Sequence, residues 1–253
     1  SEWAGVKNFM FLIKSNDLFV ILRNTILYNL VFIVLGMVVS VGLAIMISLM
    51  RNKRASKVYQ TMMFFPYFMS WVVASYFLDA FLNQNNGLIN NMLRNSGQQP
   101  IQWYMTAGAW PAILTFMYLW KSTGYNMVIY LSSISGIDTT LYEAAVMDGA
   151  NKRQQVFHIT LPCLKNVIIM MFILNVGKIF YSDFGLFYQL SQGASGSIFK
   201  TTATIDTYIY NALRSSTIGM TSAAAFFQSV ACCITIILAN AIVKKFDEDS
   251  AII

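Results

Sequence analysis

Polar and ionisable side chains lie inside the apolar runs of this chain, next to aromatic residues. Lys121 and Tyr125 are one helical turn apart, so a helix there would carry both on one face. Asn175 and Lys178 have a similar spacing, and so do Lys178 and Tyr181. Ionisable groups are costly at membrane depth and usually face a protein-lined or wet cavity. These residues are therefore candidates for a binding pathway.

Polar groups beside aromatic rings have the chemistry that an oligosaccharide needs. Sugar hydroxyls require fixed donors and acceptors, sugar C–H faces stack on apolar rings, and aromatic residues make up 15% of the chain. Two alternatives stay open, because Lys178 and Asp183 could pair with each other or with a partner subunit, and aromatic residues near span ends form interfacial belts. The candidate pathway residues are Trp120, Lys121, Tyr125, Asn126, Asn175, Lys178, Tyr181 and Asp183.

Residue sets for other chemistries are missing from the sequence. There is no phosphate-binding Gly-x-x-x-x-Gly-Lys-Ser/Thr loop, no Ser/His/Asp set and no paired-carboxylate site, so we expect no catalytic residue, and no cofactor in this chain. The lone His158 is expected to be a structural or interface residue. The net charge of +6 comes without a basic face interleaved with aromatics, so no nucleic-acid partner is expected. We also expect no metal site, because the three cysteines lack metal-ligand spacing: Cys163, Cys232 and Cys233.

The composition is that of an all-α polytopic membrane protein. Hydrophobic residues make up 57% and charged residues 11%, against about 25% charged in a typical soluble domain. Each of five apolar runs reaches the roughly 20 residues that a helix needs to cross the hydrocarbon layer. An open sheet could not satisfy its backbone in lipid, which leaves helices. The five predicted transmembrane helices cover residues 25–50, 61–82, 107–134, 163–184 and 220–243.

The distribution of lysine and arginine predicts the orientation. Basic residues gather in the first connection, in the third connection and after the fifth run, which lie on one side if all five runs cross, and that side should be the cytoplasm. We therefore predict an external segment 1–24, a transmembrane domain 25–243 with a cytoplasmic loop 136–162, and a cytoplasmic C-terminal tail 244–253. A basic N-terminus outside the cell usually needs a preceding span, so we expect a sixth, N-terminal helix in the full gene product. The basic residues are Arg51, Lys53, Arg54, Lys57, Lys152, Arg153, Lys244 and Lys245.

The loop between the third and fourth runs has its own helix signals. Thr140 and Glu143 have the spacing of a capping box, which predicts a short helix starting near Leu141. Gly149 is suited to end this helix, because glycine takes the left-handed conformation without strain. On local chemistry alone, an ordinary helical hairpin is an equal alternative to a docking element.

A second short helix is predicted directly after the first. Asn151 and Gln154 could cap its start, and Pro162 is expected to end the pair of helices. The small residues Ala144, Ala145 and Ala150 would let another surface come close.

The order of residues in this loop resembles the signature loop of permease subunits of bacterial binding-protein-dependent ABC importers. The matching residues are Glu143-Ala144-Ala145, Gly149, Ile159 and Leu161-Pro162, without a gap. In that family the loop forms the coupling helix, which sits in a cleft of a cytoplasmic ATPase. The resemblance covers nearly the whole chain and implies the type I importer permease fold. The ATPase-coupling residues that it implies are Glu143, Ala144, Ala145, Asp148, Gly149, Ile159, Leu161 and Pro162.

Other segments are similar to the sugar permeases of this family, within the maltose-permease-like superfamily. Residues 59–71 and 86–90 are similar to sugar permeases in general, and residues 120–126 and 134–138 resemble the branch that imports complex oligosaccharides. The implied partners are a second, related permease chain, two ATPase subunits that carry ATP and Mg²⁺, an extracellular substrate-binding protein and membrane lipid, in the bacterial cytoplasmic membrane. An ABC permease for amino acids or peptides, and an ion-driven secondary transporter, stay open as alternatives.

Two further expectations concern the shape of the outer half. Pro66 removes one backbone hydrogen bond and should bend the second predicted span. Residues 83–106 carry Leu88, Met92 and Leu93 at helical spacing, which predicts a short amphipathic helix at the outer membrane face. The resemblance implies that this connection and residues 185–219 meet the binding protein.

Overall fold

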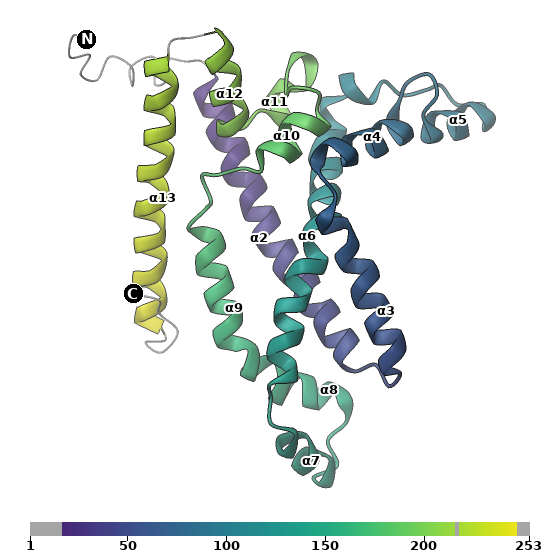
Figure 1. Ribbon diagram of the computed structural model, residues 1–253, viewed down its shortest axis with the longest axis vertical. Coiled ribbons are helices and arrows are strands. Elements are labelled where there is room, and N and C mark those ends of the chain that lie inside the picture. Colours follow the sequence, from purple (N-terminus) through teal and green to yellow (C-terminus); the bar gives the residue numbers. More distant parts are fainter. Residues whose placement is uncertain (1–16, 216–217, 247–253) are drawn as a thin grey trace. The chain divides into compact units, whose positions relative to one another are not determined.

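A computed structural model describes residues 17–215 and 218–246 of the chain (Figure 1). Every regular element in these ranges is helical, in agreement with the all-α prediction. The longer elements are α2 (Leu18–Ser48), α3 (Lys53–Phe64), α4 (Trp71–Leu82), α5 (Leu88–Asn95), α6 (Trp110–Ser135), α7 (Thr139–Met147), α9 (Leu161–Val176), α10 (Phe184–Leu190), α12 (Ile205–Ser215) and α13 (Ile218–Phe246). The single turns are η1 (Phe65–Phe68), η2 (Trp103–Met105), η3 (Ala107–Ala109), α8 (Lys152–Gln155), η4 (Val156–Thr160), η5 (Gly196–Ile198) and α11 (Phe199–Thr202).

Three helices of the described part are long and apolar enough to cross a membrane. They are α2, the continuous segment Lys152–Val176, and Thr221–Lys245 within α13. A fourth candidate arises only if the segment Lys53–Phe68 and α4 count as one broken span. α6 covers most of the predicted range 107–134 but begins at Trp110, and it is not among the candidate spans, because the polar side chains in its middle lower its mean hydropathy.

The second predicted span is broken rather than bent. α3 ends at Phe64, and Pro66 lies in the tighter turn η1 that follows. A new helix, α4, begins at Trp71, where the Ser70 hydroxyl accepts a hydrogen bond from the Val73 amide at 3.2 Å. Proline lacks an amide hydrogen, so the α-helical hydrogen-bond pattern is interrupted at Pro66, and the chain passes through a tighter turn before a new helix begins.

The fourth predicted span, 163–184, is shifted toward the N-terminus. The helix runs through Pro162, which was expected to end the preceding pair, and it stops at Val176. The wider turn η4 comes directly before the proline and ends with the Leu161 amide bonded to the Val156 carbonyl. This π-helical turn is how the helix accommodates a residue that cannot donate.

The ends of the chain also differ from prediction. α2 begins at Leu18, so the helix extends into the segment 1–24 that was expected to be external. Residues 1–16 and 247–253, which hold most of that segment and of the tail 244–253, lie outside the described residues.

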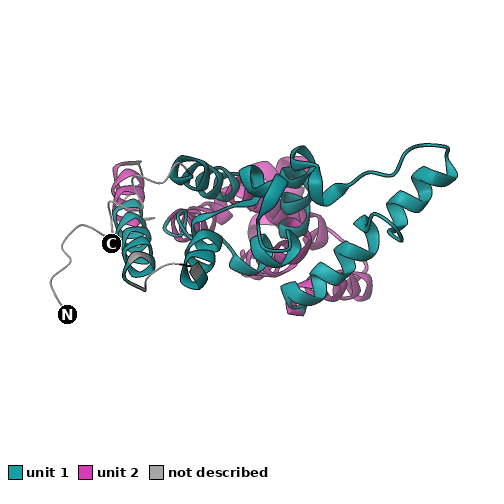
Figure 2. Ribbon diagram, turned by 90° about the horizontal axis from the view of Figure 1, so that it is seen from above, with its two compact units in different colours: residues 1–31, 69–118, 177–235 teal, residues 32–68, 119–176, 236–253 magenta. Residues whose placement is uncertain are grey.

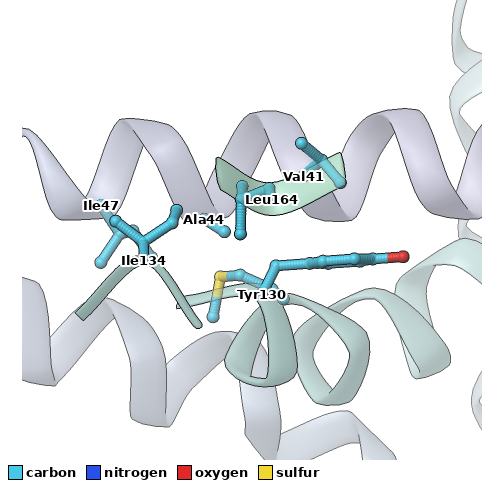
Figure 3. Packing of buried hydrophobic residues seen from close by; sticks show 7 residues of the cluster. Val41, Ala44, Ile47, Tyr130, Ile134 and Leu164 are labelled. Atoms are coloured by element: carbon cyan, nitrogen blue, oxygen red, sulfur yellow. The ribbon is translucent and has the colours of Figure 1, made fainter. Parts of the chain in front are cut away.

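The chain divides into two compact units, shown in two colours in Figure 2. Unit 1 comprises residues 1–31, 69–118 and 177–235, and unit 2 comprises residues 32–68, 119–176 and 236–253. The core of unit 2 is an apolar cluster between α2, α6 and α9 (Figure 3). Its buried residues are Val41, Ala44, Ile47, Met127, Tyr130, Ile134 and Leu164.

Within unit 2, α6 lies directly against the end of α3 at Gly124. A Cβ atom added to Gly124 would lie 1.9 Å from the Met63 carbonyl oxygen and 2.8 Å from the Phe64 nitrogen. Only a residue without a side chain allows two helices to approach this closely.

Unit 1 is held by polar side chains on the first turns of α2. Asn24 donates to the carbonyl oxygens of Lys200 and Ala203 at 3.1 and 2.9 Å, and the Tyr28 hydroxyl donates to Thr201 at 2.7 Å. Asn29 donates to the Ile179 carbonyl at 2.9 Å. These bonds satisfy the backbone of an irregular connection that could not otherwise be buried.

A second polar centre of unit 1 surrounds the Asp206 carboxylate. Its Oδ2 atom accepts hydrogen bonds from the amide and the hydroxyl of Ser182, each at 2.7 Å. Gln228 donates to both carboxylate oxygens at 3.1 and 3.2 Å, and to the Phe180 carbonyl at 2.7 Å. One carboxylate thereby joins α12, α13 and the segment that precedes α10.

The short helix predicted in residues 83–106 is present as α5, and Leu88 and Met92 are exposed on it. The connection around it is closed by Asn90, which is fully buried. Asn90 donates to the Ile101 carbonyl and accepts from the Ile101 amide, both at 2.9 Å. The position of α5 at the membrane face stays a prediction.

Candidate functional site

Residues 138–162, which we call the motif hairpin, hold α7, α8 and η4 and lie beyond the ends of α6 and α9 (Figure 1). The start of α7 differs from prediction. The helix begins at Thr139, and its cap is Asp138, whose Oδ1 atom accepts a hydrogen bond from the Thr140 amide at 2.9 Å. This bond holds the pKa of the Asp138 carboxyl below its ordinary range, because it favours the charged form. The proposed box of Thr140 with Glu143 is not the cap of this helix.

The end of α7 agrees with prediction. Gly149 has a φ angle of +79°, in the left-handed region. Its amide bonds to the Val146 carbonyl at 3.0 Å, and the Ala150 amide bonds to the Ala145 carbonyl at 2.8 Å. This pair of bonds is the Schellman arrangement, which satisfies carbonyls at the helix end.

The predicted start of the second helix is also confirmed. The Asn151 side chain accepts from the Gln154 amide at 3.0 Å, and the Gln154 side chain accepts from the Asn151 amide at 2.8 Å. This reciprocal capping box sets α8 directly after the turn at Gly149. Backbone donors and acceptors on both sides of the turn are therefore satisfied locally.

Two side-chain contacts that sequence reasoning missed tie the hairpin together. The hydroxyl groups of Tyr142 and Thr160 are 2.9 Å apart, so α7 is bonded to η4. Gln155 is buried and donates to the Ala150 carbonyl at 3.1 Å. Neither pair is separated by a spacing that a local motif would reveal, so the sequence carried no signal for them.

Most of the hairpin surface is open to solvent. α7 has no buried residue, and Met147 is 87% exposed. A recess of about 290 Å³ lies between α7 and η4, and its walls include Ala145, Ala150, His158 and Ile159. The small residues predicted to permit a close approach thus leave room for a side chain of another molecule.

A larger cavity of about 590 Å³ lies at the base of the hairpin, between α3, the end of α6 and α8. Its walls include Lys53, Lys57 and Lys152, together with Tyr142 and Thr160. The base of the hairpin is therefore not solidly packed, and its position depends on the bonds described above.

The remaining motif residues are distributed along this hairpin. Glu143 and Ala144 are exposed on α7, and Asp148 is exposed at its C-cap. Leu161 and Pro162 lie in the first turn of α9, where Leu161 is half-buried and Pro162 is exposed.

Two of the candidate pathway residues in unit 2 meet at one place. The Lys121 ammonium donates to the Tyr67 carbonyl oxygen at 2.7 Å and lies 5.4 Å from the centre of the Tyr67 ring. Tyr125 stacks on the same ring, with centroids 4.6 Å apart and planes 12° apart. The predicted shared face of Lys121 and Tyr125 is confirmed, and it faces Tyr67, which sequence reasoning did not single out as a pathway residue.

Other aromatic side chains extend this group. Phe64 lies 5.8 Å from Tyr67 and 5.0 Å from Phe68, measured between ring centroids. The remaining predicted residues of α6, Trp120 and Asn126, are half-buried. The signal for the missed rings was present in the aromatic cluster around Pro66, which was interpreted only as part of a bent span.

The candidates after α9 do not form the predicted helical face. Asn175 is exposed on α9 and donates to the Met171 carbonyl at 2.6 Å, but Lys178 and Tyr181 lie beyond the helix end at Val176. The Tyr181 hydroxyl lies 3.0 Å from the Ser229 hydroxyl. Asp183 caps α10, accepting from the Leu186 amide at 3.2 Å and from Trp71 Nε1 at 2.6 Å. Residues three or four positions apart share a face only within a helix, so the predicted face is lost where the helix ends at Val176.

The three cysteines and the histidine differ in their surroundings. Cys232 is buried, whereas Cys163 and Cys233 are exposed. His158 Nδ1 lies 3.0 Å from the Gln154 carbonyl oxygen. Within residues 17–215 and 218–246, no group of three or more His, Cys, Asp or Glu side chains could hold a metal ion.

The sequence from the middle of α2 to the end of the chain decides the family. Residues 36–248 match the model described as the inner membrane component of binding-protein-dependent transport systems. The chain belongs to this family. It is a permease component, and its motif hairpin lies within the matched residues.

Relatives of this permease include named transport proteins. The chain is 31% identical over 250 residues to the polygalacturonan/rhamnogalacturonan transport system permease protein YteP of Bacillus subtilis strain 168, covering 98% of this chain and 77% of YteP. Its fold is similar to that in the crystal structure of a bacterial ABC transporter for import of the acidic polysaccharide alginate, with a TM-score of 0.91 and 27% identity over 98% of this chain and 86% of that one. A second alginate transporter structure, in complex with a periplasmic protein that holds an alginate pentasaccharide, has a TM-score of 0.88 and 27% identity, and covers 96% of this chain and 83% of its own. The type I permease fold is therefore shown.

Proposed function

We propose that this permease is the transmembrane subunit of an ATP-driven importer that moves an oligosaccharide across the bacterial cytoplasmic membrane by alternating access. The observation that carries the proposal is the exposed helix α7, which bears the motif and buries none of its residues. Leu141, Val146 and Met147 present apolar surface on it. Large apolar side chains left exposed on a helix that buries none of its own residues favour contact with another protein. The partner that fits is a separate ATPase, because the sequence lacks a phosphate-binding loop of its own.

The geometry of the hairpin supports a mechanical role. A coupling element has to move as one piece, since bending would dissipate the displacement. The Asp138 cap and the turn at Gly149 fix both ends of α7, and the bond between Tyr142 and Thr160 fixes its middle to η4. Because η4 continues into α9, a push on α7 enters a membrane-spanning helix directly.

The assembly that follows has several chains. Two ATPase subunits bind ATP and Mg²⁺ and dock on the motif hairpin, a second related permease chain completes the pathway, and a substrate-binding protein delivers the cargo outside. The hairpin and the C-terminus then face the cytoplasm, in keeping with the basic residues of the same connections. We assign the contacts with the ATPase to the exposed motif residues and to the recess beside Ala145.

An oligosaccharide cargo is supported by the named relatives and by the group around Tyr67. Two stacked tyrosine rings offer apolar faces to a pyranose, and the Lys121 ammonium beside them could bind a hydroxyl or a carboxylate of the sugar. Tyr67 and Tyr125 keep 41% and 40% of their surface exposed. Asn175, Lys178 and Tyr181 are further pathway candidates by the same chemistry.

Bulky residues in the hairpin test the coupling role. Ala145→Trp fills the recess, and Gly149→Trp adds strain at a left-handed position, so each should reduce ATP-driven uptake more than tenfold while ATPase activity of the assembled complex persists. Gly108→Trp is a matched control, because an added Cβ at this exposed glycine meets nothing within 4 Å. Normal uptake by both hairpin variants would contradict the proposal.

A crosslink and an energy test separate the alternatives. With the native cysteines replaced by serine, Met147→Cys should crosslink to the ATPase, whereas Val58→Cys, on the exposed face of α3, should not. Proteoliposomes loaded with ATP should import the oligosaccharide after an ionophore has collapsed ion gradients. Uptake that requires the ion gradient would indicate an ion-driven secondary transporter. Uptake of amino acids or peptides but of no oligosaccharide would indicate an ABC permease for that cargo.

A further inference from the structure

Unit 1 holds a pocket of about 270 Å³ that belongs to none of the sites described above. It lies between α4, η2 and the end of α10. Positions 72, 75, 76 and 79 of α4 line it, which is one face of that helix. The side chains important to its chemistry are Ser75, Tyr76, Asp79, Tyr104, Tyr188 and Gln192.

Three tyrosine rings give the pocket apolar faces. Tyr76 is 73% exposed, so one of these rings is open to a ligand. Tyr188 is held in place by stacking on Phe184, with centroids 4.9 Å apart, and by an edge contact with Tyr210 at 4.8 Å. A fixed ring beside an open one suits the stacking of a flat, partly apolar ligand.

Polar groups converge on the same space. Tyr104, Asp79 and Gln192 all line the pocket, and burial, together with the charge of Asp79, raises the pKa of Tyr104 to about 12. Its hydroxyl therefore keeps its proton at neutral pH. Asp79 also accepts from Asn83 at 3.2 Å. The pocket thus offers a carboxylate, a hydroxyl and an amide in fixed positions.

The turn that carries Gln192 is held in an unusual conformation. Gln192 and Ala194 have φ angles of +55° and +52°, and Gly193 between them has +104°. Left-handed geometry is unfavourable for a residue that carries a Cβ atom. The Gly193 amide bonds to the Tyr188 carbonyl at 2.8 Å, and the Ala194 amide bonds to the Ser191 hydroxyl at 2.8 Å. These bonds keep Gln192 at the pocket despite the strain.

We propose that this pocket binds one neutral pyranose unit of the imported oligosaccharide. The inference rests on the proposed function and adds a second subsite to it. The aromatic rings match the C–H faces of a sugar, and the carboxylate and the amide match its hydroxyls. The volume of the pocket lies just below that of pockets for drug-sized ligands, so the pocket suits a single sugar ring. Among residues 17–215 and 218–246, those that line the pocket include Asp79 and no Lys, Arg or His, so a uronate carboxylate is disfavoured. The group around Tyr67 in unit 2 differs in this respect, because it carries the positively charged Lys121 in place of a carboxylate.

The test uses the full complex of permease, partner permease and ATPases in nanodiscs, without ATP or binding protein. The probes are trigalacturonate and its fully methyl-esterified form, which differ in charge and keep the same linkage. Saturation-transfer NMR should show binding of the ester at millimolar concentration and at least tenfold weaker binding of the acid. Asp79→Asn should reduce this preference to threefold or less.

Variants of the exposed ring locate the binding. Tyr76→Ala should reduce the transfer signal at least fivefold, whereas Tyr76→Phe should keep it, because the ring face remains. Phe77→Ala is the matched control, since Phe77 is an exposed aromatic of the same helix that does not line the pocket. No signal from the ester, tighter binding of the acid, or an unaffected Tyr76→Ala would each overturn the inference.

Uptake by proteoliposomes, measured in parallel, separates this result from the proposed function. If the wild-type complex imports an oligosaccharide but Tyr76→Ala binds the ester normally, only the pocket assignment is wrong. If the wild-type complex imports no oligosaccharide at all, the proposed function fails, and the pocket assignment fails with it.

Discussion

The two units of the permease are stabilised in different ways. Unit 2 has an apolar core between long helices, in which small residues let backbones approach closely. Unit 1 depends on polar side chains that reach across the sequence, from α2 to residues 179–203 and from Asp206 to Ser182 and Gln228. Regular helices satisfy their own backbone, whereas irregular segments need side chains to do so. The difference teaches that a membrane protein can leave helical geometry only where polar groups compensate for it.

The largest loss of stability is expected for Gly124→Ala in unit 2, which tests this contrast. The new methyl group would overlap the backbone of Met63, which cannot move aside like a flexible side chain. Overpacking costs about 1–3 kcal/mol and occasionally more, so we expect little folded protein or a strongly lowered Tm in detergent. Gly42→Ala, on α2 of the same unit, meets nothing within 4 Å and should stabilise by up to about 1 kcal/mol. Equal Tm values for Gly124→Ala and wild type would contradict the close contact between α6 and the end of α3.

The next largest effect should come from Asp206→Ala in unit 1. The substitution removes the acceptor of the Ser182 amide, which costs about 1–3 kcal/mol for a buried donor, and it leaves Gln228 with only the Phe180 carbonyl of the acceptors described above. Ser40→Ala in unit 2 is the comparison, because that hydroxyl makes only one long bond, of 3.4 Å, to the Thr123 carbonyl. Thermal unfolding should show a clear loss for the first and a change within about 0.5 kcal/mol for the second. If Ser40→Ala were the more damaging, the contrast between the units would be wrong.

The smallest effect is a pH dependence at the start of α7. The pKa of Asp138 is lowered in the folded chain, so its capping contribution is present above the unfolded pKa of about 3.9 and is lost as the pH falls through the folded value. Hydrogen exchange of the first α7 amides should therefore lose protection below about pH 4, relative to other helices. Asp138→Asn keeps a capping oxygen and should abolish the pH dependence. Persistent pH dependence in that variant would mean that another group titrates.

Sequence reasoning succeeded where the cause is local. The turn at Gly149 and the capping box of Asn151 with Gln154 depend on a few adjacent residues, and both are present as predicted. The helical nature of the chain followed from its apolar runs. The cap of α7 was assigned to Thr140 from its spacing to Glu143, whereas the helix is capped by Asp138, two residues earlier.

Sequence reasoning failed where the cause is distant. Asn24 bonds to a carbonyl 179 residues away, and no pattern within α2 predicts that contact. The helix through Pro162 depends on the wider turn η4, a rare element with no simple residue signature. At the candidate pathway, Lys121 and Tyr125 were identified by helical spacing, whereas their partner Tyr67 lies on another helical segment.

The contact at Gly124 limits how the permease can change shape. Where two helices touch through bare backbone, sliding or rolling would drive peptide groups into each other, so α6 and the end of α3 must travel as one body. Lys121 lies one turn before Gly124, and its bond to Tyr67 belongs to that same body. The ammonium and the ring would therefore stay paired whenever this body moves.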